Sequence, residues 1–225
     1  MTAAGNPSAP NLVVGTILAR RSVRFGFEDR PVSQAHLELV LECGLAAPSS
    51  KNARPWRFHV VQDSALRHEI AGAAGNAHGT DEYVPHDPRT GKPSPYWSST
   101  VLESAEVTRA ASVIVAIENR GVFSGGRRTL AAATGEALAS SLAGYGFEVM
   151  GLGAALENIW LAANSLGIGV AFLGDLNIAE QDIRALLGLE GDLMGVIALG
   201  YASLEAPPRR EPPAETQVDA PVVWH

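Results

Sequence analysis

The protein has 225 residues and a formal net charge of −7, from 17 Lys and Arg against 24 Asp and Glu. Its hydrophobic fraction of 46% and charged fraction of 18% are typical of a folded globular protein, and the length suits one domain with a sizeable core. The acidic balance argues against a nucleic-acid-binding protein, because neutralising phosphates requires a basic surface.

Cysteine and hydropathy exclude further classes. Cys43 is the only cysteine, so no intramolecular disulfide, CxxC redox pair or multi-cysteine zinc site can form, and its apolar surroundings predict a buried structural thiol. The six histidines are scattered without metal-ligand spacing, so we expect no metal site. No run of 18 apolar residues and no secretory signal pattern occur, which favours a cytoplasmic protein without a membrane partner.

The first fifty residues predict an arm followed by two helices. Residues 1–11 are small and polar and are expected to form a flexible N-terminal arm. Apolar residues recur at helical spacing from Leu12 and end at Arg20-Arg21. Ser33 is a suitable N-cap for a second helix, which must end before Pro48.

The remainder alternates strands and helices. We expect strands at 58–61, 113–117, 167–173 and 193–201. We expect helices at 64–74, at 179–187 and through most of 130–165. The glycines of 130–165 either break that helix or let another backbone approach it closely. Residues 75–98 and 121–128 read as loops, the former long enough to suggest a lid or binding loop. Such alternation indicates an α/β or α+β layered domain.

Familiar catalytic motifs are incomplete in this chain. The segment 151–156, GLGAAL, begins like a dinucleotide fingerprint but lacks the third glycine and a strand directly before it. There is no Gly-x-Ser-x-Gly elbow and no Ser-x-x-Lys pair. If the protein is an enzyme, we therefore expect a cofactor to supply the chemistry.

Two polar clusters look unlike ordinary packing. The first is Arg20-Arg21-Ser22-Val23-Arg24, whose forked donors suit a phosphate and carbonyl oxygens, although a charged cap on the preceding helix is equally compatible. The second is the run 47–56, APSSKNARPW, where short polar side chains lie between two prolines and a tryptophan. An ordinary Ser/Asn/Pro turn is the alternative for this second cluster.

Together, the two clusters resemble motifs of the FMN-dependent nitroreductase family. Its first motif is close to Arg-(Arg/His)-Ser-x-(Arg/Lys), and its second is close to (Ala/Ser)-Pro-Ser-Ser-x-Asn-x-Gln-Pro-Trp. Arg54 stands where the family usually has glutamine. Segments 161–169, 172–174, 197–201 and 207–210 are also similar, while 75–130 matches only loosely.

The resemblance implies an α+β fold: a three-layer sandwich with a central, mostly antiparallel sheet flanked by helices, in an intertwined homodimer. The FMN-binding domain would span 12–204, with variable lid and substrate loops at 75–130, and the tail 205–225 would wrap the partner subunit. Two FMN molecules would lie at the dimer interface, and NAD(P)H would be the electron donor.

The resemblance also assigns residues to the cofactor. Arg20, Arg21 and Ser22 would contact the ribityl chain and phosphate, and Arg24 the pyrimidine edge of the flavin. Either Arg209 or Arg210 would close on the phosphate, with Arg210 preferred. Two groups complete the implied site: Pro48, Ser49, Ser50 and Asn52 from the partner subunit, and Leu173 with Gly174, whose backbone would face flavin N5.

No protein side chain is expected to be catalytic, because FMN would carry hydride from NAD(P)H to a nitroaromatic, quinone or similar electron-poor acceptor in a ping-pong cycle. Two alternatives remain open at this point. One keeps the fold but makes the protein an oxidase, dehydrogenase or reductive dehalogenase, and the other is a flavin-binding subunit without turnover. Residues 75–130 would encode the choice.

Overall fold

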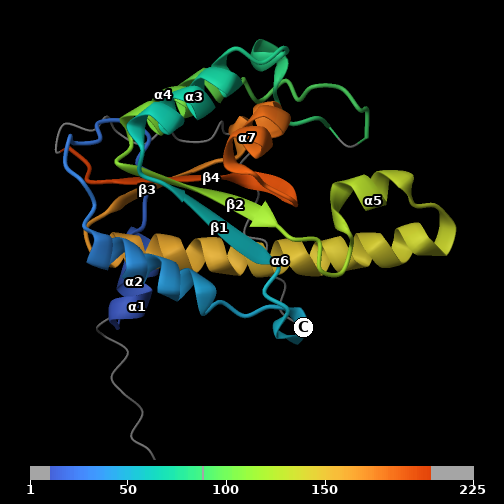
Figure 1. Ribbon diagram of the computed structural model, residues 1–225, viewed down its shortest axis with the longest axis horizontal. Helices are drawn as coiled ribbons and strands as arrows, with labels where there is room; N and C mark the ends of the chain where they lie inside the picture. The colour runs from blue at the N-terminus through green and yellow to red at the C-terminus, as the bar shows by residue number, and fades with distance from the viewer. Residues whose placement is uncertain (1–10, 88, 204–225) are drawn as a thin grey trace, which may run out of the picture.

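The computed structural model describes residues 11–87 and 89–203. A central four-stranded sheet lies between two helical layers (Figure 1). One layer holds α3, α4 and α7, and the other holds α1, α2 and the long α6. The helices run as follows: α1 Leu12–Ala19, α2 Gln34–Leu45, α3 Ser64–Gly75, α4 Val101–Ala110, α5 Gly126–Ala132, α6 Gly135–Ser165 and α7 Glu180–Leu187. This arrangement confirms the expected α+β three-layer sandwich.

The sheet is antiparallel throughout, in the order β1-β2-β4-β3. Its strands are β1 Trp56–Val61, β2 Val113–Asn119, β3 Gly169–Leu173 and β4 Asp192–Gly200. The central strands β2 and β4 are almost wholly buried, because helices cover both faces of the sheet. In an antiparallel strand that faces water on one side, apolar and polar residues alternate. The continuous apolar runs of β2 and β4 instead reflect helices packed on both faces of the sheet.

Local capping explains where several helices begin. The Ser33 side chain accepts a hydrogen bond from the backbone N–H of His36 and caps α2, as the sequence predicts. Asp63 caps α3 in the same way through the N–H groups of Ala65 and Leu66. Cys43, predicted to be buried, is only half-buried on α2.

Two helices lie where the sequence predicts none. Helix α4 contains β-branched and hydroxyl residues that are poor helix formers, and it is stabilised by burying Val101, Ala105 and Val107. Helix α5 begins at Gly126, inside the predicted loop 121–128. Most residues of both helices are nonetheless good helix formers, so local propensity is compatible with a helix at both places.

The long helix α6 is uninterrupted for 31 residues, or about 46 Å. Its glycines therefore do not break it. At Gly144, an added Cβ would lie only 3.0 Å from the carbonyl carbon of Phe123, so a neighbouring backbone makes the close approach that the sequence left open. Gly153, on the same helix, has no atom within 4 Å of an added Cβ.

We expect Gly144→Ala to lower the free energy of unfolding by about 1–3 kcal/mol, because the new methyl group forces the 120–124 loop away from α6. The matched control Gly153→Ala should be neutral or stabilising by up to about 1 kcal/mol, through helix propensity alone. Urea unfolding of both variants measures the difference. Equal effects would contradict the close approach.

Candidate functional site

The first cluster, residues 20–24, follows α1 and lies beside the start of β3. Ser22 forms an isolated bridge with Val170, and the N–H of Val23 donates to the Val170 carbonyl at 2.9 Å. Gly169 admits this segment, since an added Cβ would lie 2.9 Å from Val23 Cγ2. The segment is thus an added edge of the sheet, with the Ser22 residue exposed.

Contacts with α6 hold the arginine end of this segment. The Arg20 guanidinium lies 4.6 Å from the centre of the Trp160 ring, and its Nε is 3.4 Å from Glu157 Oε1. Trp160 Nε1 in turn donates to the Arg21 carbonyl at 3.4 Å. Arg24 points elsewhere: its Nη1 is 3.8 Å from Glu103 Oε1 on α4. Arg21 caps α1, because its guanidinium donates to the Leu18 and Arg20 carbonyls, but Arg20 and Arg24 contact α6 and α4, so the cluster does more than cap a helix.

The second cluster adopts an unusual backbone. Lys51, Asn52 and Arg54 have φ values of 51°, 54° and 47°, a left-handed conformation that residues other than glycine seldom adopt. The Ser49 hydroxyl accepts from the Arg54 N–H at 3.0 Å and helps to hold the loop. Strain of this kind persists where the surroundings impose it, which is common at binding sites.

Within one chain the two clusters lie apart along α6. Ser49 sits beside Gly151, whose added Cβ would be 3.3 Å from Ser49 Cβ, whereas Arg20 sits beside Trp160. Nine residues of helix separate Gly151 from Trp160, a rise of about 13 Å. A ligand that touches both clusters must therefore either span this distance or take one of the clusters from a second chain.

The third predicted segment, Leu173-Gly174, lies where β3 ends. Leu173 is buried, and Gly174 begins a 3-10 helix (η3, Gly174–Ala179) and is half-buried. The Phe172 ring lies against Gly174, 3.4 Å from the position of an added Cβ. Arg209 and Arg210 lie outside the described residues.

Two polar networks that were not predicted from the sequence support this region. In the first, the fully buried Glu148 carboxylate on α6 accepts hydrogen bonds from Asn119 Nδ2 at 2.9 Å, from Ser124 Oγ at 2.7 Å and from the backbone N–H groups of Phe123 and Ser124. Burial raises the pKa of Glu148, but these hydrogen bonds outweigh it and hold the pKa below its ordinary value. The charged carboxylate thereby ties the loop after β2 to the middle of α6.

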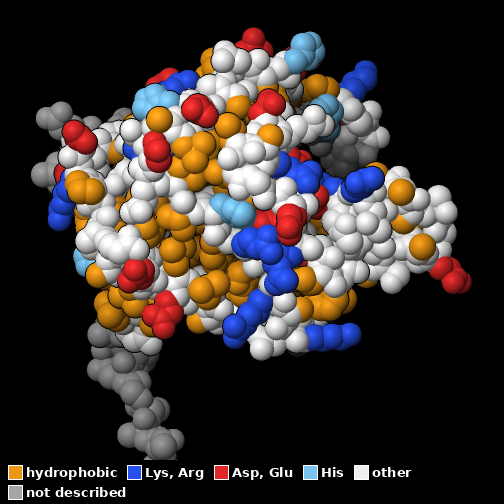
Figure 2. Space-filling model, in the orientation of Figure 1, with side chains coloured by type: hydrophobic (Ala, Val, Ile, Leu, Met, Phe, Trp, Pro, Cys, Tyr) orange, Lys and Arg blue, Asp and Glu red, His pale blue; other side chains and the backbone are white. Residues whose placement is uncertain are grey.

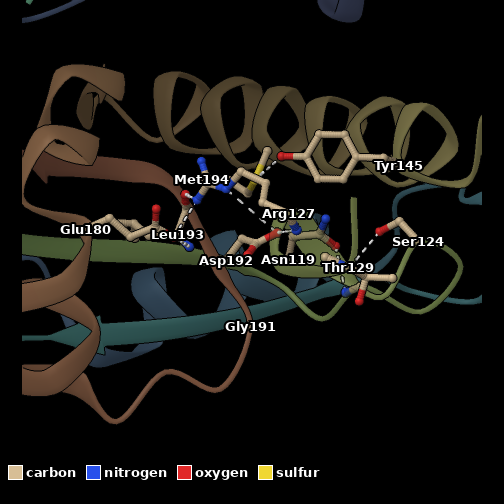
Figure 3. A network of polar contacts seen from close by, with 12 residues as sticks. Asn119, Ser124, Arg127, Thr129, Tyr145, Glu180, Gly191, Asp192, Leu193 and Met194 are labelled. Atoms are coloured by element: carbon tan, nitrogen blue, oxygen red, sulfur yellow. Dashed lines mark hydrogen bonds and ion pairs between the residues drawn. The ribbon is translucent and has the colours of Figure 1, made fainter. Parts of the chain in front are cut away.

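The second network joins α5 to β4 and α7. Figure 3 shows Arg127 between Glu180, Leu193 and Asp192. Its backbone N–H donates to Asp192 Oδ2 at 2.7 Å, and its guanidinium donates to Glu180 and, at 2.9 Å, to the Leu193 carbonyl. Arg127 is therefore committed to structural contacts.

The family model for the "Nitroreductase family" matches residues 17–201, most of the chain. The chain belongs to the nitroreductase family. Among the relatives of this chain, an NADH dehydrogenase of Thermus thermophilus is 29% identical over 208 residues, 89% of this chain and 92% of that protein.

Solved nitroreductase-fold structures agree in architecture. A nitroreductase with bound FMN from Bacteroides fragilis has a TM-score of 0.63 at 23% identity, covering 96% of this chain and 99% of that one. An NADPH:FMN oxidoreductase from Vibrio harveyi complexed with NAD+ has a TM-score of 0.62 at 21% identity, covering 95% and 78%. At these identities the likeness shows the fold.

The nitroreductase's described residues contain no helix long and apolar enough to cross a membrane. Nor do the described side chains include a group of three or more His, Cys, Asp and Glu arranged to hold a metal ion.

One sequence signal for the Glu148 network existed and was missed. Glu148 is the only charged residue between Glu136 and Glu157, in a helix otherwise rich in small and apolar residues. A lone carboxylate in such a stretch is either buried with partners or exposed at a gap in the apolar face. Glu148 also follows Gly144 by one helical turn, so both residues lie on the side of α6 that contacts the 120–124 loop.

Stability should fall in acid because of Glu148 and a second buried carboxylate, Glu118. Burial raises the pKa of Glu118 too, but hydrogen bonds from His59 and the Gly191 N–H, with the Arg57 charge, leave it lowered. Since both pKa values are lower in the folded state, the stability they provide is present above about pH 4.5 and is lost as the pH falls through the folded pKa values.

We expect Glu148→Gln to destabilise the protein at pH 7 by about 3 kcal/mol, because an amide group then faces buried donors. Its stability should also decline less steeply than that of the wild type below about pH 4.5. Glu190→Gln, at an exposed ion pair, is the control and should change stability by less than about 1 kcal/mol. Parallel acid profiles for wild type and Glu148→Gln, measured by urea unfolding, would contradict the assignment.

Proposed function

We propose that this nitroreductase is a homodimeric, FMN-dependent NAD(P)H oxidoreductase whose cofactor lies between subunits. The observation that carries the proposal is the separation of the two family motifs along α6. A second chain would bring Pro48, Ser49, Ser50 and Asn52 to the arginine segment of the first. The relatives named for NADH dehydrogenase activity, for bound FMN and for NADPH:FMN oxidoreductase activity support the same reading.

The donor set fits a phosphate-bearing cofactor. Arg20, Arg21 and Arg24 concentrate positive charge within five residues of a protein whose net charge is −7. The forked donors of a guanidinium group suit phosphate oxygens. Ser22, which is exposed at the same edge of the sheet, carries a hydroxyl group that can also bind phosphate. In this assignment Arg20, Arg21 and Ser22 hold the ribityl phosphate, with Arg209 or Arg210 from the tail.

The remaining contacts orient the ring. Arg24 would lie at the pyrimidine edge, where a positive charge favours the reduced, anionic flavin. The backbone at Leu173 and Gly174 would face N5. The chemistry that bound FMN supplies is hydride transfer at N5, from NAD(P)H to an electron-poor acceptor such as a nitroaromatic or a quinone, in a ping-pong cycle.

Exposed apolar surface supports the dimer. Helix α1 has no buried residue among its eight, although Leu12, Val13, Ile17 and Leu18 are apolar. On α6, Met150 is 74% exposed and Phe147 is 51% exposed. Figure 2 shows hydrophobic side chains gathered at the lower left, over α1 and α2. Exposed apolar side chains gathered in this way are typical of an interface, and the tail 205–225 would extend it around the partner.

The visible absorption of the purified protein tests the proposed function directly. The purified protein should be yellow or become so with added FMN, and anaerobic NADH or NADPH should bleach it within seconds. A colourless protein that takes up no FMN would overturn the proposal. A yellow protein that ignores both nicotinamides would reject the reductase assignment and point to an oxidase or a dehalogenase.

A shared site predicts complementation between two defective chains. Arg24→Ala and Asn52→Ala should each weaken FMN binding at least tenfold, because each removes a polar contact from both sites of the homodimer. A co-expressed mixed dimer carries both changes in one site and neither in the other. It should bind one FMN per dimer with wild-type affinity.

The affinity and stoichiometry of the mixed dimer are measured by fluorescence titration after purification through two different tags. Arg109→Ala, in an ion pair on α4, is the control and should leave FMN binding unchanged. Weak binding at both sites of the mixed dimer would show that each chain builds its own site.

A further inference from the structure

Asp175 follows Gly174 directly and meets the start of α4. The hydroxyl groups of Thr100 and Ser104 both donate to its Oδ2, the latter at 3.3 Å. Ser104 is fully buried, so its hydroxyl depends on Asp175 for a hydrogen bond. The turn after β3 is thereby joined to α4, seventy residues earlier in the chain.

The Thr100 side chain bonds to Asp175 instead of capping the N-terminus of α4. It is the N-cap residue of α4, yet its side chain makes no capping hydrogen bond and instead bonds to Asp175. Through these two hydroxyl groups the Asp175 carboxylate is held at the N-terminal end of α4, where a negative charge is favoured. The contact joins the start of α4 to the turn after β3.

The two ends of the connection that precedes α4 lie side by side. The Ser99 hydroxyl donates a hydrogen bond to the Thr80 carbonyl, which brings together the residues on either side of this variable connection, 81–98. Ser99 directly precedes Thr100, whose hydroxyl bonds to Asp175. The ends of the variable connection are therefore joined, through Thr100, to the turn at Gly174.

The first turn of α4 also meets the other predicted flavin contact. Glu103, next to Ser104, lies 3.8 Å from the Arg24 guanidinium. One helical turn thus touches Arg24, which would favour the reduced flavin, and Asp175, whose charge has the opposite sign. The balance between these two charges is a property of this chain's own residues.

We propose that Asp175 is a positioning residue that fixes α4 and the ends of the variable connection beside Gly174, and that its charge lowers the reduction potential of the bound FMN. The proposal rests on the proposed function, because it places the flavin at Gly174. A nearby negative charge disfavours the added electrons and the anionic reduced ring. The Asp175 charge therefore offsets the effect of the Arg24 charge on the reduction potential and makes bound FMN harder to reduce.

The test is the midpoint potential of bound FMN, measured anaerobically against a reference dye. Asp175→Asn removes the charge but keeps an oxygen that can accept from Thr100 and Ser104. We expect a more positive potential, with the ratio of reduced to oxidised FMN at a fixed potential rising about tenfold. Asp182→Asn, an equal charge change at an exposed position on α7, is the matched control and should leave the potential unchanged.

A merely structural role makes a different prediction. If Asp175 only holds the start of α4, Asp175→Asn lowers the melting temperature and leaves the potential equal to that of Asp182→Asn, which would overturn the proposal. Should Asp175→Asn fail to fold, Asp175→Ser removes the same charge and is read out in the same way. A wild-type protein that takes up no FMN would overturn the proposed function and this inference with it, whereas an unchanged potential in the loaded variant contradicts this inference alone.

Discussion

Packing along α6 is the constraint on which the rest of the molecule depends. A single straight helix crosses one whole face of the sheet, and the polar segments are positioned by what its successive turns permit. Trp160 and Glu157 hold Arg20, Gly151 admits Ser49, and Gly144 with Glu148 holds the loop after β2. Because a helix has a fixed rise per residue, these positions also fix how far apart the segments lie.

Local charge, rather than net charge, describes the proposed site. The protein is acidic overall, yet the segment 20–24 concentrates three arginines at one edge of the sheet. Acidic partners on α6 and α4 lie near two of them, so the segment combines strong positive charge with defined geometry. Buried carboxylates elsewhere are satisfied by hydrogen bonds, and they stabilise loops instead of binding ligands.

The predictions from sequence succeeded where local chemistry decided the outcome. The Ser33 cap, the end of α2 before Pro48 and the apolar runs of β2 and β4 depend on neighbouring residues, and each was predicted. They failed where distant contacts decided it. Helix α4 was not predicted, and its position on the sheet is held by buried apolar residues and by the bond from Thr100 to Asp175, 75 residues later in the chain. The residue roles of the site remain predictions, because they require a cofactor and a second chain.

By itself, the sequence determined the layered class of the fold, the positions of most helices and strands, and the family motifs at 20–24 and 47–56. These follow from periodicity, capping and residue chemistry, which act over a few residues. Only the tertiary structure decided that the two motifs lie apart along α6, that the loop around Asn52 is left-handed, and that Asp175 meets α4. Such facts depend on which distant surfaces pack together, and no local pattern of residues encodes that choice.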